Sequence, residues 1–129
     1  QVIYDADDTP DPQAWLAADD AARLAAVEAH HRALVGPHPP MPRPRVHAAI
    51  HLVVEGQLAS GEPPQARRAL DRLVRGGLSR HEAVHAIGSL VASATQGALS
   101  GKRFDAADYG RALDALTPEG WRAEGSAAR

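Results

Sequence analysis

The stretch from Pro44 to Gly61 reads PRVHAAIHLVVEGQLASG and predicts a helix with ligand-type side chains along one face. Proline suits the first turn of a helix and glycine suits its end, so both boundaries are marked. His47, His51 and Glu55 follow one another at intervals of four residues, which places all three on roughly one face over two turns. Imidazole and carboxylate groups so arranged are typical of a metal site.

A second stretch, His81-Glu82-Ala83-Val84-His85, has the H-E-x-x-H spacing. Two imidazoles one turn apart can hold one zinc ion while the intervening glutamate acts as a general base. Ser79 precedes Glu82 by three residues, which is also a capping-box signature and marks the start of a helix expected to reach Leu99. Glu82 therefore has two interpretations, as a catalytic base and as a helix cap.

The rest of the chain predicts an all-α fold, a single-domain helical bundle of about four main helices plus short C-terminal helices. The remaining helical segments are expected at Pro12 to Val35 with a break near Asp19, Pro63 to Gly76, Asp105 onward, and a last turn from Thr117. The domain spans residues 1–129, with an extended N-terminal arm over residues 1–11, a proline-rich connector over 36–42 and a disordered tail over 125–129.

Composition excludes several classes of protein. The 129 residues carry a formal net charge of −2, which gives no basic field for nucleic acid. The chain has no cysteine, so disulfides and thiolate metal sites are excluded, and any metal must be held by imidazole and carboxylate. No apolar run approaches the roughly 20 residues that span a bilayer, so we expect no membrane association and a cytoplasmic protein.

Weaker candidates lie elsewhere in the chain. Glu28 precedes His31 by three residues, an E-x-x-H step that Glu82 and His85 repeat, as in dinuclear carboxylate bundles. Glu28 is also four residues before Arg32, so a solvated ion pair is the alternative. Arg80 and Arg45 lie beside candidate ligands and are weak candidates for binding a substrate carboxylate. We assign the remaining two histidines, His30 and His38, to solvent.

Several motifs together resemble a small, uncharacterised bacterial family, a domain of unknown function with paired H-x-x-x-H and H-E-x-x-H helices. The motifs are Ala14-Trp15-Leu16, Glu28 to Arg32, Val46 to Ala59, Leu70 to Leu73, Gly77 to Gly88 and Leu116 to Trp121. The resemblance covers most of the chain and implies that the two histidine helices act as one unit. Gly56 departs from the acidic or amide residue expected after Glu55, which weakens the helix by roughly 1 kcal/mol relative to alanine.

Two functional hypotheses involve catalysis. In the leading one, His81 and His85, with His51 or Glu55 as third ligand, hold a divalent metal that activates water for Glu82. Zinc is the first choice of metal and a small molecule is the expected substrate, because the chain offers little strand edge for a peptide. The alternative is a dinuclear iron or manganese centre with oxygen or peroxide chemistry, using all the histidine and glutamate candidates.

Two further hypotheses need no catalysis. If His47, His51, His81 and His85 all bind a single zinc ion, the tetrahedral shell is closed and the site is structural. If the histidines only pack and hydrogen-bond, the domain is a metal-free interaction module. The sequence also leaves open a homodimer that completes the site.

Overall fold

The predicted all-α fold is confirmed by the structure, a computed structural model that describes residues 3–33 and 43–127, with side chains up to Glu124. These described residues form seven helices and no strand. The helices are α1 (Pro12–Ala17), α2 (Asp20–Ala33), α3 (Pro44–Ser60), α4 (Pro64–Arg75), α5 (Arg80–Leu99), α6 (Ala106–Ala115) and α7 (Pro118–Ala127). The predicted connector and His38 lie outside the described residues.

The helix boundaries follow the local signals in the sequence. The Asp11 carboxylate accepts a hydrogen bond from the Ala14 amide at 3.0 Å and caps α1. Asp19 accepts from the Ala22 amide at 2.7 Å, so the predicted break near Asp19 separates α1 from α2. Gly61 ends α3 with a φ of 76°, a left-handed conformation that glycine adopts without steric cost.

Two other predicted caps are present, and the last helix is longer than predicted. The Ser79 hydroxyl accepts from the Glu82 amide at 3.0 Å at the start of α5. Asp105 caps α6 by accepting from the first amides of that helix. The segment that starts at Pro118 continues to Ala127, past the point at which the sequence predicted that ordered structure ends.

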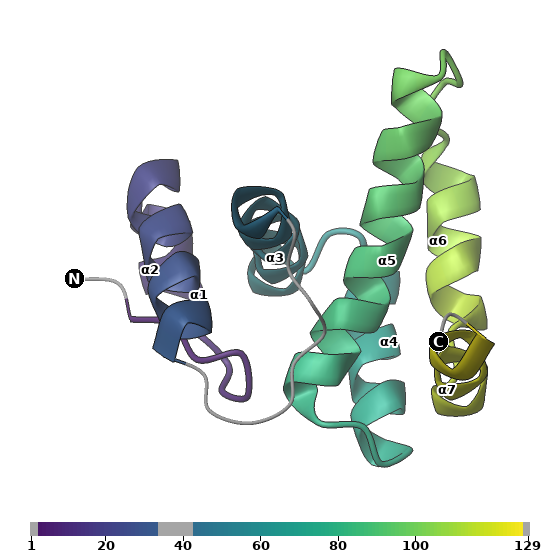
Figure 1. Cartoon of the computed structure of the whole chain (residues 1–129), viewed down its shortest axis with the longest axis horizontal. Helices are drawn as coiled ribbons and strands as arrows, with labels where there is room; N and C mark the ends of the chain where they lie inside the picture. Colours follow the sequence, from purple (N-terminus) through teal and green to yellow (C-terminus); the bar gives the residue numbers. More distant parts are fainter. Residues whose placement is uncertain (1–2, 34–42, 128–129) are drawn as a thin grey trace.

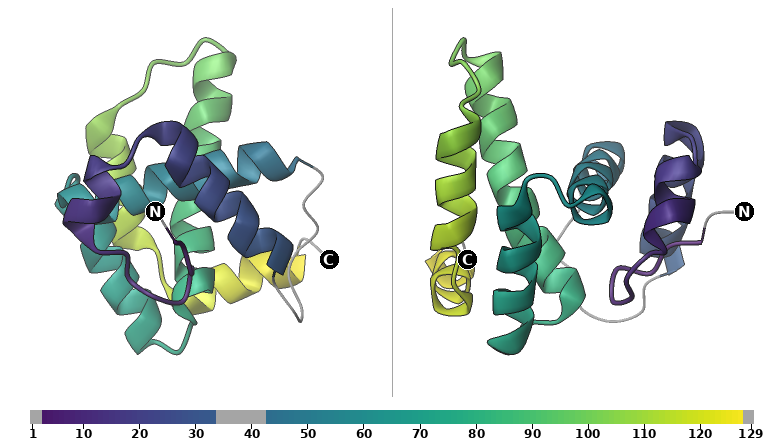
Figure 2. Two further views of the ribbon diagram at one scale, coloured as in Figure 1. Left: turned by 90° about the vertical axis from the view of Figure 1, so that its left-hand side faces the viewer. Right: turned by 180° about the vertical axis from the view of Figure 1, so that it is seen from behind.

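Helix α3 lies in the middle of the molecule (Figures 1 and 2). Helices α1 and α2 pack on one side of it, and α5 packs on the other. Helices α4 and α6 then pack against α5 and against each other. The side chains of α3 are therefore the ones that can take part in a site with both α2 and α5.

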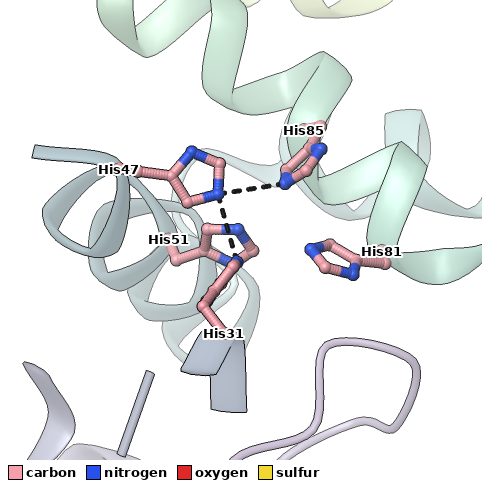
Figure 3. A group of neighbouring side chains, drawn as sticks. All are labelled: His31, His47, His51, His81 and His85. Atoms are coloured by element: carbon pink, nitrogen blue, oxygen red, sulfur yellow. Dashed lines mark hydrogen bonds between the residues drawn. The ribbon is translucent and has the colours of Figure 1, made fainter. Parts of the chain in front are cut away.

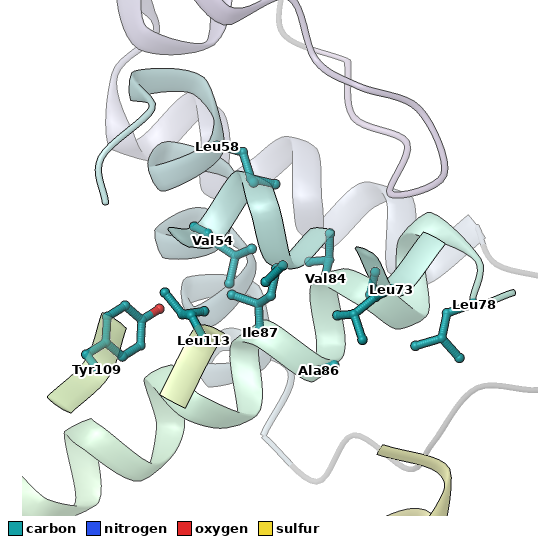
Figure 4. Close-up of a cluster of buried hydrophobic side chains, with 12 residues drawn as sticks. Val54, Leu58, Leu73, Leu78, Val84, Ala86, Ile87, Tyr109 and Leu113 are labelled. Atoms are coloured by element: carbon teal, nitrogen blue, oxygen red, sulfur yellow. The ribbon is translucent and has the colours of Figure 1, made fainter. Parts of the chain in front are cut away.

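Two apolar cores lie on the two sides of α3. The larger joins α3 to α4, α5 and α6, and its largest fully buried members include Val54, Leu73, Ile87 and Leu113 (Figure 4). The smaller joins the N-terminal arm, α1, α2 and α3, and consists of Tyr4, Ala6, Trp15, Ala26, Val27 and Ala48. Burial of apolar area in these cores is the main favourable term that holds the helices together.

The N-terminal arm is fixed to the bundle by buried side chains and by polar contacts with α5. Tyr4 is 5% exposed and Ala6 is fully buried. Arg80 donates to the Ala6 carbonyl at 2.9 Å, and Asp7 accepts from the His81 amide at 3.1 Å. The described part of the arm thus lies across the start of α5, as Figure 2 shows.

None of the helices in the described ranges has the combination of length and apolar character that crossing a membrane requires.

The glycine inside α3 provides a test of the helix itself. A Cβ added at Gly56 would meet no atom within 4 Å, so Gly56→Ala is expected to raise the free energy of unfolding by about 0.5–1 kcal/mol. The matched control is Gly88→Ala in α5, whose Cβ would lie 2.8 Å from Cγ2 of Ile50 and should destabilise the protein. Urea unfolding measures both changes, and a loss of stability in Gly56→Ala would contradict the prediction.

Candidate metal centre

Five histidines from three helices meet between α2, α3 and α5 (Figure 3). One ring nitrogen from each lies within 4.8 Å of all the others. The five are His31 from α2, His47 and His51 from α3, and His81 and His85 from α5. We call this set the histidine cluster. It is a group that could hold a metal ion, as the sequence predicted.

The cluster forms because two one-turn histidine pairs lie on facing helices. His47 and His51 project from one side of α3, and His81 and His85 project from the side of α5 that faces it. The two helices approach closely at Gly88, where a Cβ would lie 2.8 Å from Ile50. His31, in the last turn of α2, reaches the same place because α2 packs on α3.

Two of the distances between ring nitrogens, both to His47, are close to that expected around one shared ion. Nε2 of His47 lies 3.1 Å from Nε2 of His31 and 3.2 Å from Nε2 of His85. Two nitrogens bound to one tetrahedral zinc ion at the usual bond length are about 3.4 Å apart. A ring nitrogen carries either one proton or one lone pair, so His47 Nε2 cannot both donate to one neighbour and accept from the other. A central cation accepts lone pairs from all of them.

His31 already presents a lone pair to the cluster. Its Nδ1 lies 2.9 Å from the carbonyl oxygen of Val27, one turn earlier in α2. A carbonyl oxygen only accepts hydrogen bonds, so this Nδ1 carries the proton and the neutral ring has its lone pair on Nε2. A backbone carbonyl that fixes the tautomer in this way is common behind histidines that bind metals.

His51 is the most buried member of the cluster, with 1% of its surface exposed. Its Nε2 is buried and has no hydrogen-bond partner among the described residues. Leaving a buried polar atom without a partner costs about 1–3 kcal/mol, so such an atom needs an explanation. A metal ion among the five rings supplies one.

Burial also determines the charge state of His51. Desolvation, followed by the neighbouring rings of His85, His31, His47 and His81, strongly lowers the pKa of His51 below its ordinary value. The ring is therefore neutral at pH 7 and keeps the lone pair that a metal requires.

Glu55 does not join the cluster, although the spacing of α3 predicted that it would be a ligand. Its carboxylate is 1% exposed and is held by both terminal nitrogens of Arg80 at 2.7 and 2.8 Å. Tyr4 also donates to it at 2.5 Å. Arg80 is 9% exposed and neutralises Glu55, so neither its charge nor its position suits the predicted contact with a substrate.

Glu28 and Arg45 also differ from their predicted roles. Glu28 lies outside the cluster and forms ion pairs with Arg32 at 3.9 Å and with Arg45 at 3.5 Å. The ion pair with Arg32 that the sequence offered as the alternative for Glu28 is therefore present, but Glu28 is half-buried and not fully solvated. Arg45 is 84% exposed and is used in this pair at the surface.

Glu82 is exposed and is not one of the clustered ligands. Its amide is capped by Ser79, which confirms the start of the helix that the sequence predicted. The Glu82 side chain is exposed at the surface, next to His81 in the first turn of α5.

Two residues near the cluster were not recognised from the sequence. His30 was assigned to solvent but is half-buried, and its Nε2 accepts from the Ala6 amide at 3.4 Å. Tyr4 lies in the segment predicted only as an extended N-terminal arm, and its hydroxyl lies 3.0 Å from Nδ1 of His51. The position of His30 near the cluster could have been predicted, because His30 is adjacent to His31 in the sequence. No local pattern indicates that Tyr4 contacts His51.

The burial of His51 predicts the pH dependence of the metal-free protein. The folded-state pKa lies below the ordinary value of 6.5, so between the two values the unfolded chain binds a proton that the folded chain does not. The free energy of unfolding should therefore fall as the pH decreases below 6.5, by up to about 1.4 kcal/mol per pH unit for this one group.

Urea unfolding in the presence of a chelator, between pH 7.5 and pH 5.0, measures this slope. His51→Gln removes the titrating ring and should flatten the dependence. A wild-type stability that rises on acidification through this range would contradict the prediction.

No protein-family model matches the sequence, and no curated protein or solved structure is similar to the chain. The resemblance to a family with paired H-x-x-x-H and H-E-x-x-H helices thus stays a prediction. Support for a metal site comes from the side chains themselves, above all from the histidine cluster and the buried Nε2 of His51.

Proposed function

We propose that this protein binds one divalent metal ion, zinc foremost, through the histidine cluster. The observation that carries the proposal is the convergence of five ring nitrogens, including a buried Nε2 of His51 without a partner among the described residues. The candidate ligands come from α3 and from α2 and α5, which pack on its two sides. A bound ion would therefore also link the two sides of the molecule.

The donor set favours zinc over harder ions. All five candidate ligands are imidazoles, which suit zinc, copper, nickel and iron, whereas magnesium, calcium and manganese prefer oxygen ligands. Zinc usually takes four ligands, and five rings supply one more than a tetrahedral shell requires. If one ring stays outside, the other four close the shell, and if two stay outside, one position is left for water.

The dinuclear alternative has less support, because such centres use carboxylates to hold and bridge two ions. Glu55 is bound by Arg80 and Tyr4, and Glu28 is paired with arginines outside the cluster. With these two carboxylates outside the cluster, the five imidazoles are better matched to one ion.

Elemental analysis of protein purified without a histidine tag tests the number and kind of ions. We expect about one zinc ion per chain in the wild type and a large loss in the double variant His47→Ala/His85→Ala, because only three of the five rings then remain. The matched control is His30→Gln, which changes the neighbouring half-buried histidine that is not in the cluster. Equal metal content in His47→Ala/His85→Ala and the wild type would exclude the site.

A second candidate function, hydrolysis of a small molecule, is favoured by the exposure of the site. Three of the five rings, those of His47, His81 and His85, belong to half-buried residues, so part of the cluster lies near the surface. A zinc ion held by histidines supplies a Lewis acid that makes water more acidic. Glu82, exposed beside His81 on α5, is the group proposed to accept the proton.

Glu82→Gln distinguishes a catalytic base from a helix cap. If Glu82 is the base, hydrolysis of activated ester substrates should fall by about 10²–10⁴-fold while the metal content and melting temperature are retained. Ser79→Ala is the matched control, because it removes the observed cap and should cost about 1 kcal/mol of stability without loss of metal.

If the metal-loaded wild type shows no turnover, the site is structural and the closed four-histidine shell is the better description. A fully folded wild-type protein that takes up no metal would instead support the metal-free interaction module.

A further inference from the structure

Behind His51, four side chains from three parts of the chain form a continuous buried hydrogen-bonded series. Arg80 on α5 binds Glu55 on α3 through two hydrogen bonds, at 2.7 and 2.8 Å. Tyr4 of the N-terminal arm lies 2.5 Å from Glu55 and 3.0 Å from Nδ1 of His51. Tyr4, Glu55 and His51 are at most 5% exposed, and the side chain of Arg80 is 9% exposed.

The direction of every hydrogen bond in this series follows from its ends. Arg80 can only donate, and the Glu55 carboxylate can only accept. The single hydroxyl proton of Tyr4 is given to Glu55 in the shorter contact, so the Tyr4 oxygen accepts in the contact with His51. Nδ1 of His51 must then carry the ring proton. The lone pair of the neutral ring is consequently on Nε2, the atom that has no partner among the described residues.

We propose that Tyr4 is a positioning residue for the metal site, with Glu55 and Arg80 holding it in place. It selects the His51 tautomer whose Nε2 lone pair is available to the ion. This inference rests on the proposed metal-binding function and adds to it a requirement for the N-terminal arm.

The N-terminal arm is fixed in the position in which Tyr4 contacts His51. Arg80 donates from the same nitrogen to Glu55 and to the Ala6 carbonyl, two residues after Tyr4, at 2.8 and 2.9 Å. The ring of Tyr4 packs against Trp15 with centroids 5.6 Å apart and edge-on to His51 at 5.9 Å. The arm, α3 and α5 therefore meet at one buried ion pair.

The pairing also explains how a carboxylate can act behind the cluster without competing for the ion. Both oxygens of Glu55 are occupied by Arg80, and the positive charge of Arg80 offsets the negative charge of Glu55. The Tyr4 hydroxyl donates its proton to Glu55, and its oxygen accepts the Nδ1 proton of His51. Tyr4 itself adds no net charge. Outer partners of this kind change metal affinity typically by 10–100-fold.

Tyr4→Phe removes the hydroxyl and keeps the ring. Zinc affinity, measured by competition with a chromophoric chelator, should weaken by about 10–100-fold relative to the wild type. The matched control is Tyr109→Phe, which removes the hydroxyl of another buried tyrosine, bonded to Gln57 at 3.0 Å in the larger core. Its zinc affinity should be unchanged.

A second measurement reads the tautomer directly. In metal-free wild-type protein, the ring ¹⁵N shifts of His51 should show the proton on Nδ1, and Tyr4→Phe should lose this preference. A wild-type His51 protonated on Nε2 would overturn the inference, as would a folded Tyr4→Phe that binds zinc as tightly as the wild type.

The two proposals can fail separately. If the wild type takes up no zinc, the proposed function is wrong, while the tautomer of His51 still decides whether Tyr4 positions this ring. If the wild type binds zinc and Tyr4→Phe binds it equally well, only the role of Tyr4 is wrong. Should Tyr4→Phe not fold, the tautomer in the wild type remains the deciding result.

Discussion

The close packing of α3 against α5 is the constraint on which the rest of the site depends. It is set by Gly88, which leaves no room for a Cβ beside Ile50. At this separation, the one-turn histidine pair of each helix faces the other pair. Helix α2 then needs to add only His31 from the opposite side of α3. A wider spacing between α3 and α5 would leave two separate surface pairs in place of one cluster.

The same packing places a carboxylate and a guanidinium in the interior. A buried ion pair is costly to desolvate, and good hydrogen bonds offset part of this cost. Here Arg80 and Tyr4 donate to Glu55, and Arg80 also donates to the Ala6 carbonyl, whereas Nε of Arg80 is buried without a partner among the described residues. Burial, followed by the charge of Glu55, raises the pKa of Tyr4, so its hydroxyl keeps its proton. The polar interior and the histidine cluster are thus one connected arrangement, with the neutral ring of His51 on one side and a neutralised ion pair on the other.

A bound ion in this position would join the two apolar cores. The smaller core includes the arm, α1 and α2, and the larger includes α4, α5 and α6, with α3 shared between them. Since the ligands come from α2, α3 and α5, the binding free energy of the metal would add to the stability of the whole domain. Coupling of this kind is compatible with a structural role and with a catalytic role of the site.

The sequence by itself determined the all-α class, the main helix boundaries and the two one-turn histidine pairs. These depend on local chemistry, such as the caps at Asp11 and Ser79 and the four-residue spacing of His47 and His51. Only the tertiary structure decided which predicted ligands meet. Glu55 shares a helix face with the histidines, but its partners Arg80 and Tyr4 come from distant parts of the chain, so spacing along one helix could not reveal that its charge is used elsewhere. The placement of Tyr4 likewise depends on how the arm crosses α3 and α5, which is set by long-range packing and not by any local pattern.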